Sequence, residues 1–301
     1  MQKLIEKANT LVEALPYIKK FSGKTFVIKY GGAAQIDESL KNAFAQDIVL
    51  LNFIGVHPVV VHGGGPKISQ MMKKLGKEPR FINGQRVTDQ ETMEIVEMVL
   101  GGLINKEIVS LINSHGGKAI GLTGKDGPLI RAEKKKKSAR SGKNKAASNE
   151  ETDILSGGTD LGLVGDVKEV NRDILLNLQR EDLITVISPI GAGPGGEALN
   201  INADSAASAV AAALKAEKLI LLTDVPGIME NGKTVSTLDV KRAQEMIKKG
   251  IVSGGMIPKT QACIEALRAG VGKTHILDGR ISHCLLLEIF TKEGVGTEIK
   301  P

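Results

Sequence analysis

The feature that most constrains the fold of this chain is a series of short, unbroken apolar runs, each followed by a segment of helical period. Runs of Val, Ile and Leu without polar alternation are typical of strands buried on both faces, as in parallel sheets. Helical segments between such strands supply the crossovers that a parallel sheet needs. The sequence therefore predicts an α/β fold, a three-layer αβα sandwich with a mostly parallel central sheet, whose strands are residues 25–29, 58–61, 119–122, 184–188, 218–223 and 274–277.

Helical period predicts most of the remaining elements. An antiparallel hairpin is expected from residues 129–132 and 164–170. No internal repeat or Pro/Ser-rich linker divides the 301 residues, so we predict one domain. The expected helices span residues 3–20, 37–54, 66–75, 89–114, 171–180, 202–215, 239–249 and 256–269.

Composition indicates a soluble protein of a reducing compartment. Aromatic residues make up 3% of the chain and Trp is absent, so the core must consist of Val, Ile, Leu and Ala. Cys263 and Cys284 show no metal or redox spacing, which favours free, buried thiols. Without a signal peptide or an apolar stretch of about 20 residues, we expect a cytoplasmic protein with no membrane partner.

The basic charge of the chain is concentrated in one segment. Seven basic and no acidic residues lie between Lys134 and Lys145, and without them the formal charge falls from +6 to −1. We interpret residues 133–150 as a basic mobile insertion. Because this segment has no aromatic side chain to stack on bases, a nucleic-acid partner is not favoured, although an acidic partner or RNA stays an alternative.

Two glycine-rich turns predict sites for anions. Lys29 ends a predicted strand before Gly31 and Gly32, and open α/β sheets place ligands at such strand ends. The second turn, residues 62–66, leads from a strand into a helix whose first-turn amides attract anions. Its glycines are contiguous and Ile68 replaces the third glycine of a dinucleotide fingerprint. No Walker motif is present either, so phosphoryl transfer outside the P-loop class is indicated.

Further polar clusters have both structural and functional interpretations. Arg86 offers a planar fork suited to a carboxylate, although most arginines are surface residues. Asn202 and Asp204 are candidate helix N-caps, and Asp204 could instead hold one or both lysines in place. Lys259 lies in the first turn of a predicted helix after Gly254 and Gly255. A cation there is unfavourable by roughly 0.3–1 kcal/mol unless an anion lies close by.

The order of these motifs resembles the amino-acid kinase family over residues 10–300, apart from the basic insertion. The motifs are Lys-Tyr-Gly-Gly, His-Gly-Gly-Gly-Pro, Asn-Gly-x-Arg-Val-Thr-Asp, Asn-Ile-Asn-Ala-Asp and Gly-Gly-Met-Ile-Pro-Lys. The resemblance implies that ATP phosphorylates the γ-carboxylate of N-acetyl-L-glutamate, a step of arginine biosynthesis. The third motif favours this acceptor over aspartate, carbamate, glutamate or UMP. Mg²⁺ is expected to be carried by ATP, with no metal site formed by the protein.

The resemblance also implies roles for particular residues. It implies that Lys29 and Lys259 stabilise the transferring phosphoryl group and that Asp204 orients them. The implied lobes are residues 21–198 for the acceptor and 199–301 for ATP. Acceptor contacts are implied for Gly64, Gly65, Arg86 and Asn200, and nucleotide contacts for Gly31, Gly32, Thr223, Asp224, Gly227 and Lys259.

The two ends of the chain resemble the arginine-inhibited, hexameric branch of the family. The implied partners are further copies of the chain, joined through an oligomerisation helix at residues 1–20, and L-arginine as a feedback inhibitor. A signalling protein of the PII type is a further candidate partner. The implied arginine site comprises Tyr17, His275, Glu288 and Gly294.

Two alternative functions stay open. One is a sibling kinase of the same fold, such as glutamate 5-kinase. The other is a regulator that binds arginine and has lost catalysis, although every implied catalytic position is filled. Turnover measured with a panel of acceptors distinguishes a sibling kinase, because only the proposed enzyme should require the acetyl group. Turnover with any acceptor excludes the non-catalytic regulator.

Overall fold

The computed structural model describes residues 1–135, 160–291 and 294–301. Its main sheet contains all six predicted strands, which run parallel to one another, while β16 pairs antiparallel with β15 at one end. The predicted α/β class with a mostly parallel sheet is therefore confirmed. In spatial order the strands are β14 (Thr237–Asp239), β16 (Gly296–Lys300), β15 (Lys273–Asp278), β11 (Lys218–Thr223), β1 (Thr25–Tyr30), β2 (His57–His62), β8 (Ile184–Ser188) and β5 (Ala119–Thr123).

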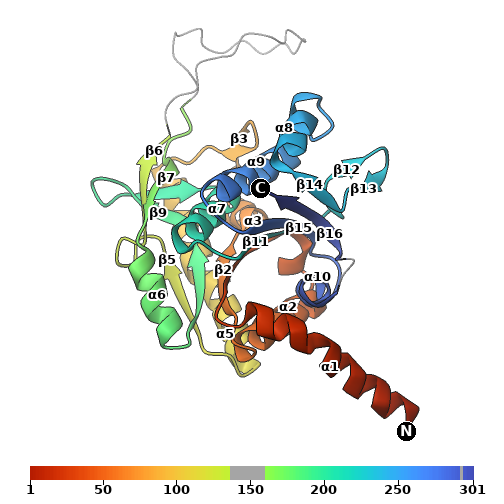
Figure 1. Ribbon diagram of the computed structural model, residues 1–301. Coiled ribbons are helices and arrows are strands. Elements are labelled where there is room, and N and C mark those ends of the chain that lie inside the picture. Colours follow the sequence, from red (N-terminus) through yellow and green to blue (C-terminus); the bar gives the residue numbers. More distant parts are fainter. Residues whose placement is uncertain (136–159, 292–293) are drawn as a thin grey trace.

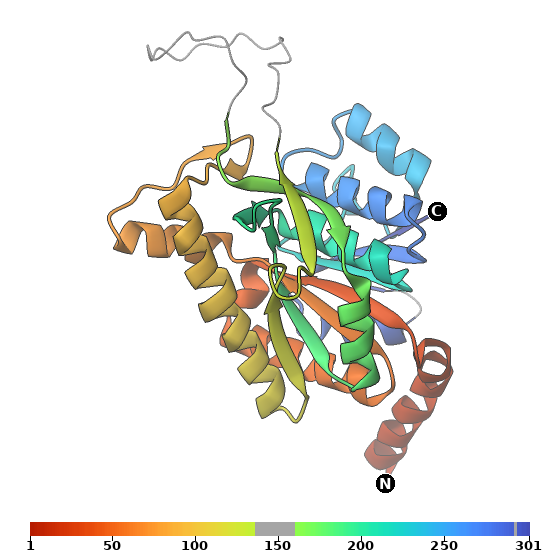
Figure 2. The ribbon, with the colours of Figure 1, turned by 90° about the vertical axis from the view of Figure 1, so that its left-hand side faces the viewer.

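Alternate residues of each buried strand pack into two separate cores, one on each face of the sheet. On β1, Phe26 and Ile28 face one core and Val27 faces the other. The continuous apolar runs of the sequence are explained by this double burial. Helices cover both faces (Figure 2), as the three-layer prediction requires: α2 (Glu38–Phe53), α5 (Asn105–Ser114) and α10 (Cys284–Phe290) on the first, and α6 (Arg172–Arg180), α7 (Ala203–Leu214), α8 (Val240–Lys248) and α9 (Met256–Arg268) on the second.

A small closed barrel of four strands stands beside the main sheet. Its members are β10 (Ala198–Ile201), β7 (Val164–Val170), β6 (Ile130–Lys134) and β9 (Ile190–Ala192). The antiparallel pairing of β6 with β7 confirms the predicted hairpin. Of the basic insertion predicted at 133–150, only residues 133–135 lie within the described part of the chain.

Short elements connect these layers. The sequence did not predict the two-residue strands, because a pair of ladder residues leaves no periodic signal. The connecting elements are the 3₁₀ turn η1 (Gly32–Gln35), α3 (Gly65–Lys74), and the hairpins β3 (Phe81–Ile82) with β4 (Gln85–Arg86) and β12 (Met229–Glu230) with β13 (Lys233–Thr234). Of these, α3 confirms the helix predicted at residues 66–75.

The helix predicted at residues 89–114 is correct in extent but not regular. It comprises α4 (Gln90–Val96), a π-helical segment η2 (Glu97–Ile104) and α5. The backbone N–H of Asn105 reaches back five residues to the carbonyl of Leu100, the wide turn that defines a π-helix. The wide turn includes Gly101 and Gly102, and glycines weaken a regular helix.

The first helix, α1 (Gln2–Phe21), extends away from the body of the protein (Figures 1 and 2). Its last turns contact the body through two edge-on aromatic pairs. The ring centres are 6.1 Å apart for Tyr17 and Phe290 and 5.2 Å apart for Phe21 and Phe26. No helix among the described residues is long and apolar enough to cross a membrane. Several apolar side chains of α1 are nevertheless exposed, namely Leu4, Ile5, Leu11, Val12 and Leu15.

Two neighbouring leucines of α2 provide a test of the core on the first face. Leu51 is fully buried, whereas Leu50 is 42% exposed. Leu51→Ala should lower the free energy of unfolding by about 3 kcal/mol, because it leaves a cavity in a packed core. Leu50→Ala should lower it by less than about 1 kcal/mol. Urea unfolding of both variants measures the difference, and equal losses would contradict this packing.

Candidate active site

A cleft of about 840 Å³ lies at the carboxyl ends of β1 and β2. It is lined by the turns after both strands and by the amino-terminal turns of α7 and α9. This is the edge at which parallel sheets bind ligands, because strand ends and helix N-termini meet there. The structure thus brings five separate sequence motifs to one cavity, represented in its lining by Lys29, Gly64, Arg86, Asn200 and Lys259.

At the centre of the cleft, one carboxylate lies between two lysines from opposite ends of the chain. Asp204 Oδ1 is 3.3 Å from Lys29 Nζ, and Asp204 Oδ2 accepts a hydrogen bond of 2.7 Å from Lys259 Nζ. The side chains of Lys29 and Asp204 are 10% and 6% exposed, and that of Lys259 is 17% exposed. The cluster carries two positive charges and one negative charge, so it retains a net attraction for an anion.

Burial and charge act against each other in this cluster. Burial lowers the pKa of Lys29, and the nearby Lys259 lowers it further, while Asp204 partly opposes both effects. Burial alone would raise the pKa of Asp204, but the two lysines more than offset it and hold that pKa below its ordinary value. Asp204 is therefore ionised at neutral pH and can orient both ammonium groups.

Local sequence explains why Asp204 is available for this role. Asn202 caps α7, because its side-chain oxygen accepts hydrogen bonds from the backbone N–H groups of Asp204 and Ser205 at 2.9 and 3.1 Å. Of the two candidate N-caps, Asn202 is the one that caps the helix, and the Asp204 carboxylate two residues on is left to face the lysines. Gly31, directly after β1, leaves room for the Lys29 side chain, since a Cβ there would lie 2.8 Å from Lys29 Nζ.

The predicted acceptor residues line one side of the cleft. Arg86 Nη2 donates hydrogen bonds to the Gly65 carbonyl at 2.9 Å and to Ser69 Oγ at 2.8 Å. Its guanidinium carbon lies 4.7 Å from the centre of the Phe81 ring, a cation–π contact that orients the plane. Asn200 Nδ2 donates to Thr88 Oγ1 at 3.2 Å. Both side chains are therefore oriented before any ligand arrives.

The predicted nucleotide residues divide into two groups. Gly31, Gly32 and Lys259 line the cleft, whereas Thr223, Asp224 and Gly227 lie beside it, at the end of β11 and in the following turn. Asp224 joins the two groups, because its Oδ1 accepts a hydrogen bond of 2.6 Å from the backbone N–H of Ala33. A Cβ at Gly32 would collide with Asp224, and the φ of +74° there also favours glycine.

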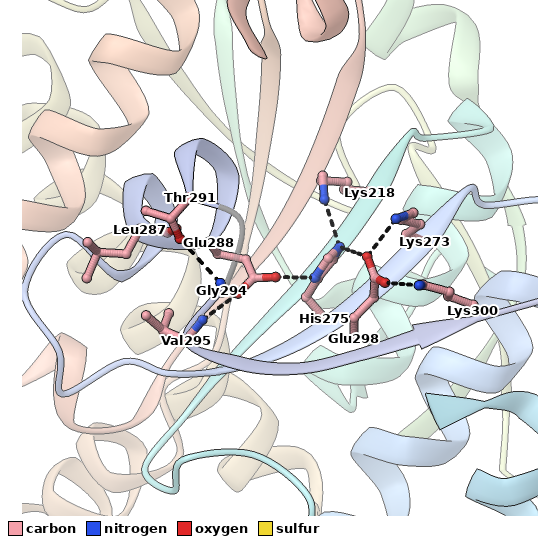
Figure 3. Close-up of polar contacts among 10 residues, drawn as sticks. All are labelled: Lys218, Lys273, His275, Leu287, Glu288, Thr291, Gly294, Val295, Glu298 and Lys300. Atoms are coloured by element: carbon pink, nitrogen blue, oxygen red, sulfur yellow. Dashed lines mark hydrogen bonds and ion pairs between the residues drawn. The ribbon is translucent and has the colours of Figure 1, made fainter. Parts of the chain in front are cut away.

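Three of the four predicted arginine-site residues, His275, Glu288 and Gly294, belong to a second polar cluster (Figure 3), none of whose labelled residues lines the cleft. His275 Nδ1 donates a hydrogen bond of 2.8 Å to Glu288 Oε1, and His275 Nε2 accepts one of 2.9 Å from Lys218 Nζ. The backbone N–H of Val295 donates to Glu288 Oε2 at 2.8 Å, which fixes the loop after Gly294. Glu288 is thus held from two sides.

Lys218 was not predicted, although a lysine that opens a buried apolar strand was the available signal. Burial lowers its pKa to about 8. Tyr17 approaches from α1 and contacts Phe290, two residues beyond Glu288. Three elements that are far apart in the sequence, α1, β11 and α10, therefore meet around this cluster.

Some residues that line the cleft were missed by sequence reasoning. Gln35 donates hydrogen bonds to the carbonyls of Tyr30 and Gly63, both at 3.3 Å, and so links the two glycine turns. Leu100 and Pro189 also line the cavity. None of the three belongs to a glycine or charge motif, and only the fold brings them there. Within the described residues, no three His, Cys, Asp or Glu side chains are grouped to hold a metal ion.

Comparison with known proteins agrees with this architecture. The model of the amino acid kinase family matches residues 24–278. The acetylglutamate kinase of Sulfurihydrogenibium sp. (strain YO3AOP1) is 57% identical, and 99% of each chain is covered. That of Persephonella marina (strain DSM 14350 / EX-H1) is also 57% identical with 99% of each chain covered. A solved N-acetylglutamate synthase from Neisseria gonorrhoeae, complexed with coenzyme A and N-acetyl-glutamate, has a TM-score of 0.81 at 25% identity, covering 98% of this chain and 63% of that chain.

The shared carboxylate makes a prediction about stability. Asp204→Asn should lower the free energy of unfolding by about 3 kcal/mol at pH 7, because it leaves the buried Lys29 ammonium without a partner. Asp173→Asn is the control, since that carboxylate is 81% exposed and lies 3.9 Å from Arg172. The control should change stability by less than about 0.5 kcal/mol. Urea unfolding measures both variants. An unchanged free energy of unfolding in Asp204→Asn would show that the lysines do not depend on this carboxylate.

Proposed function

The chain belongs to the amino acid kinase family, and we propose that it catalyses the acetylglutamate kinase reaction. It transfers the γ-phosphoryl group of ATP to the γ-carboxylate of N-acetyl-L-glutamate, giving N-acetyl-L-glutamyl 5-phosphate and ADP. Relatives that carry this name are 57% identical over 99% of the chain. The observation that carries the proposal is the pair of lysines around one buried carboxylate in the cleft.

The chemistry requires charge stabilisation rather than a general base. A carboxylate with a reference pKa of about 4.3 is already ionised at pH 7. An oxygen of that carboxylate forms a bond to the γ-phosphorus while the bond to the bridging oxygen of ADP breaks. The main barrier is repulsion between two anions, which positively charged side chains and backbone N–H groups reduce.

In this mechanism Lys29 and Lys259 stabilise the charge on the transferring phosphoryl group. Asp204 touches both ammonium groups and keeps them at a fixed separation, so it acts with them in the catalytic cluster. Lys259 lies in the first turn of α9, where the helix dipole disfavours a cation. A phosphate bound there would be stabilised both by the ammonium group and by the dipole.

On the acceptor side, the amides of Gly64 and Gly65 would bind the reacting carboxylate and Arg86 the α-carboxylate, with Asn200 as a further contact. The charge of the cleft supports an acetylated acceptor. Its lining has four cationic side chains and three carboxylates, so a net positive charge remains that would disfavour the α-ammonium group of free glutamate. Acetylation removes that charge and leaves a neutral amide.

On the nucleotide side, Gly31 and Gly32 would approach the phosphates, together with Lys259. Thr223, Asp224 and Gly227 would border the remainder of the nucleotide, beside the cleft. Mg²⁺ would enter with ATP and be held mainly by phosphate oxygens and water, since small, strongly hydrated Mg²⁺ commonly binds in this way. The metal would supply positive charge that neutralises part of the phosphate charge.

ADP release in the presence of Mg-ATP tests this function. Turnover is expected with N-acetyl-L-glutamate and not with glutamate, and Lys29→Ala should reduce kcat by at least about 100-fold, the effect of removing a charge-stabilising donor. Lys24→Ala is the control, because Lys24 precedes the same strand with its side chain 52% exposed. Equal turnover of glutamate would favour glutamate 5-kinase. A folded protein that binds arginine without any turnover would favour a regulator.

We further propose that the chain assembles into a ring of copies and is inhibited by arginine. The exposed apolar side chains of α1 support assembly, because contact with a second copy would bury them away from water. Tyr17, His275, Glu288 and Gly294 would form the arginine site, and Glu288 is suited to a guanidinium group. A PII-type protein could then dock on the assembly.

The arginine proposal has its own test. Glu288→Gln removes one negative charge from the cluster and should raise the arginine concentration for half-inhibition by at least about tenfold, the effect of losing a charged hydrogen bond. Glu245→Gln is the control, since that side chain is 56% exposed on α8. Titration calorimetry with arginine measures binding directly. Identical affinities in the wild type and Glu288→Gln would exclude this carboxylate from the site.

A further inference from the structure

A buried polar network lies directly behind the acceptor side of the cleft. His62 ends β2 and Ser188 ends the neighbouring β8, and both are completely buried. His62 Nε2 is 3.0 Å from Ser188 Oγ and 3.3 Å from Asn105 Nδ2. The Asn105 amide group also donates a hydrogen bond of 3.0 Å to the carbonyl of Val186 on β8. Asn105 is fully buried as well, so the network is shielded from water.

The protons of this network can be assigned from its partners. His62 Nδ1 lies 2.9 Å from the Gly63 carbonyl, which only accepts, so Nδ1 carries the hydrogen and Nε2 is the acceptor. Burial lowers the pKa of His62 to about 4, which keeps the ring neutral. Lys106 Nζ donates to Asn105 Oδ1 at 3.1 Å, and this contact turns the Asn105 NH₂ group toward His62.

The network also holds the π-helical segment in place. The single hydroxyl hydrogen of Ser188 goes to the carbonyl of Leu100 at 2.9 Å, which already accepts the backbone N–H of Asn105. The hydrogen bond to His62 Nε2 is therefore donated by the Asn105 amide group. The side chain of Leu100 packs against the glycine turn, because a Cβ at Gly64 would lie 2.5 Å from Leu100 Cδ2. One set of buried hydrogen bonds therefore fixes both the end of β2 and the wall that supports Gly64.

We propose that His62, Ser188 and Asn105 are positioning residues, which set the amides of Gly64 and Gly65 for the acceptor carboxylate. This inference rests on the proposed function, in which those two amides contact the acceptor. None of the three side chains lines the cleft formed by the described residues, so they act through the glycine turn and Leu100. Their loss should weaken the binding of the acceptor and leave the nucleotide side largely unchanged.

Ser188→Ala tests the proposal, with Thr185→Val as its control on the same strand. Thr185 is fully buried and its hydroxyl has no hydrogen-bond partner among the described residues, so Val replaces it without breaking a contact. Ser188→Ala should raise the KM for N-acetyl-L-glutamate about tenfold, equivalent to about 1.4 kcal/mol, and should leave the KM for ATP within about twofold. A simple loss of stability would instead lower the fraction of folded enzyme, and so the apparent kcat, and would leave both KM values unchanged.

A second variant and a second measurement keep the proposal independent of turnover. His62→Asn retains a donor toward the Gly63 carbonyl but lacks the Nε2 acceptor, so its effect should not add to that of Ser188→Ala. Hydrogen exchange of the ligand-free protein should be faster at residues 62–66 and 97–105 in Ser188→Ala and unchanged in Thr185→Val. Unchanged exchange would overturn the proposal. Faster exchange in a protein without kinase activity would show that the network holds the glycine turn, while it would remove the acceptor that this turn is proposed to bind.

Discussion

The site depends on a single carboxylate held between two ammonium groups. Asp204 and Lys259 lie in the first turns of α7 and α9, and Lys29 lies one residue before the end of β1, so this contact ties the centre of the sheet to two helices of one layer. Bringing these charges out of water is costly, and the site remains stable only because each charge has a partner. The excess of one positive charge is what an incoming phosphate can neutralise. The geometry of the cleft and its preference for anions thus have the same physical origin.

Much of the fold could be predicted because double burial leaves a local signal. The six parallel strands are short runs dominated by apolar residues, since their two faces contribute to two separate cores. The short strands β9 and β10 could not be predicted, because three or four residues among glycines carry no period and pair only through the barrel. The π-helical segment was missed for a related reason. Its wide turn is stabilised by Ser188, which is 88 residues away from Leu100.

The candidate site likewise contains residues that a local sequence pattern predicts and residues that only the fold brings together. Lys29, Asp204 and Lys259 could be proposed because each stands in a motif of glycines or caps, and their order resembles a known family. That order does not say that they meet around one carboxylate, which depends on the register of β1 and the packing of α7 on α9. Gln35 and Ser188 were beyond prediction, since an isolated polar residue has no sequence pattern. Their contacts become visible only when strands distant in the chain lie side by side.

The contact of Tyr17 with Phe290 has a spectroscopic consequence. The chain has two tyrosines and no Trp, so its ultraviolet emission comes mainly from Tyr17 and Tyr30. Tyr30 is buried at the end of β1 and stacks on Phe44 at 3.8 Å, next to the cleft, whereas Tyr17 marks the junction of α1 and α10. The two chromophores therefore sit at the two regions discussed above, the cleft and the distal polar cluster. The unlabelled protein carries one optical reporter for each of them.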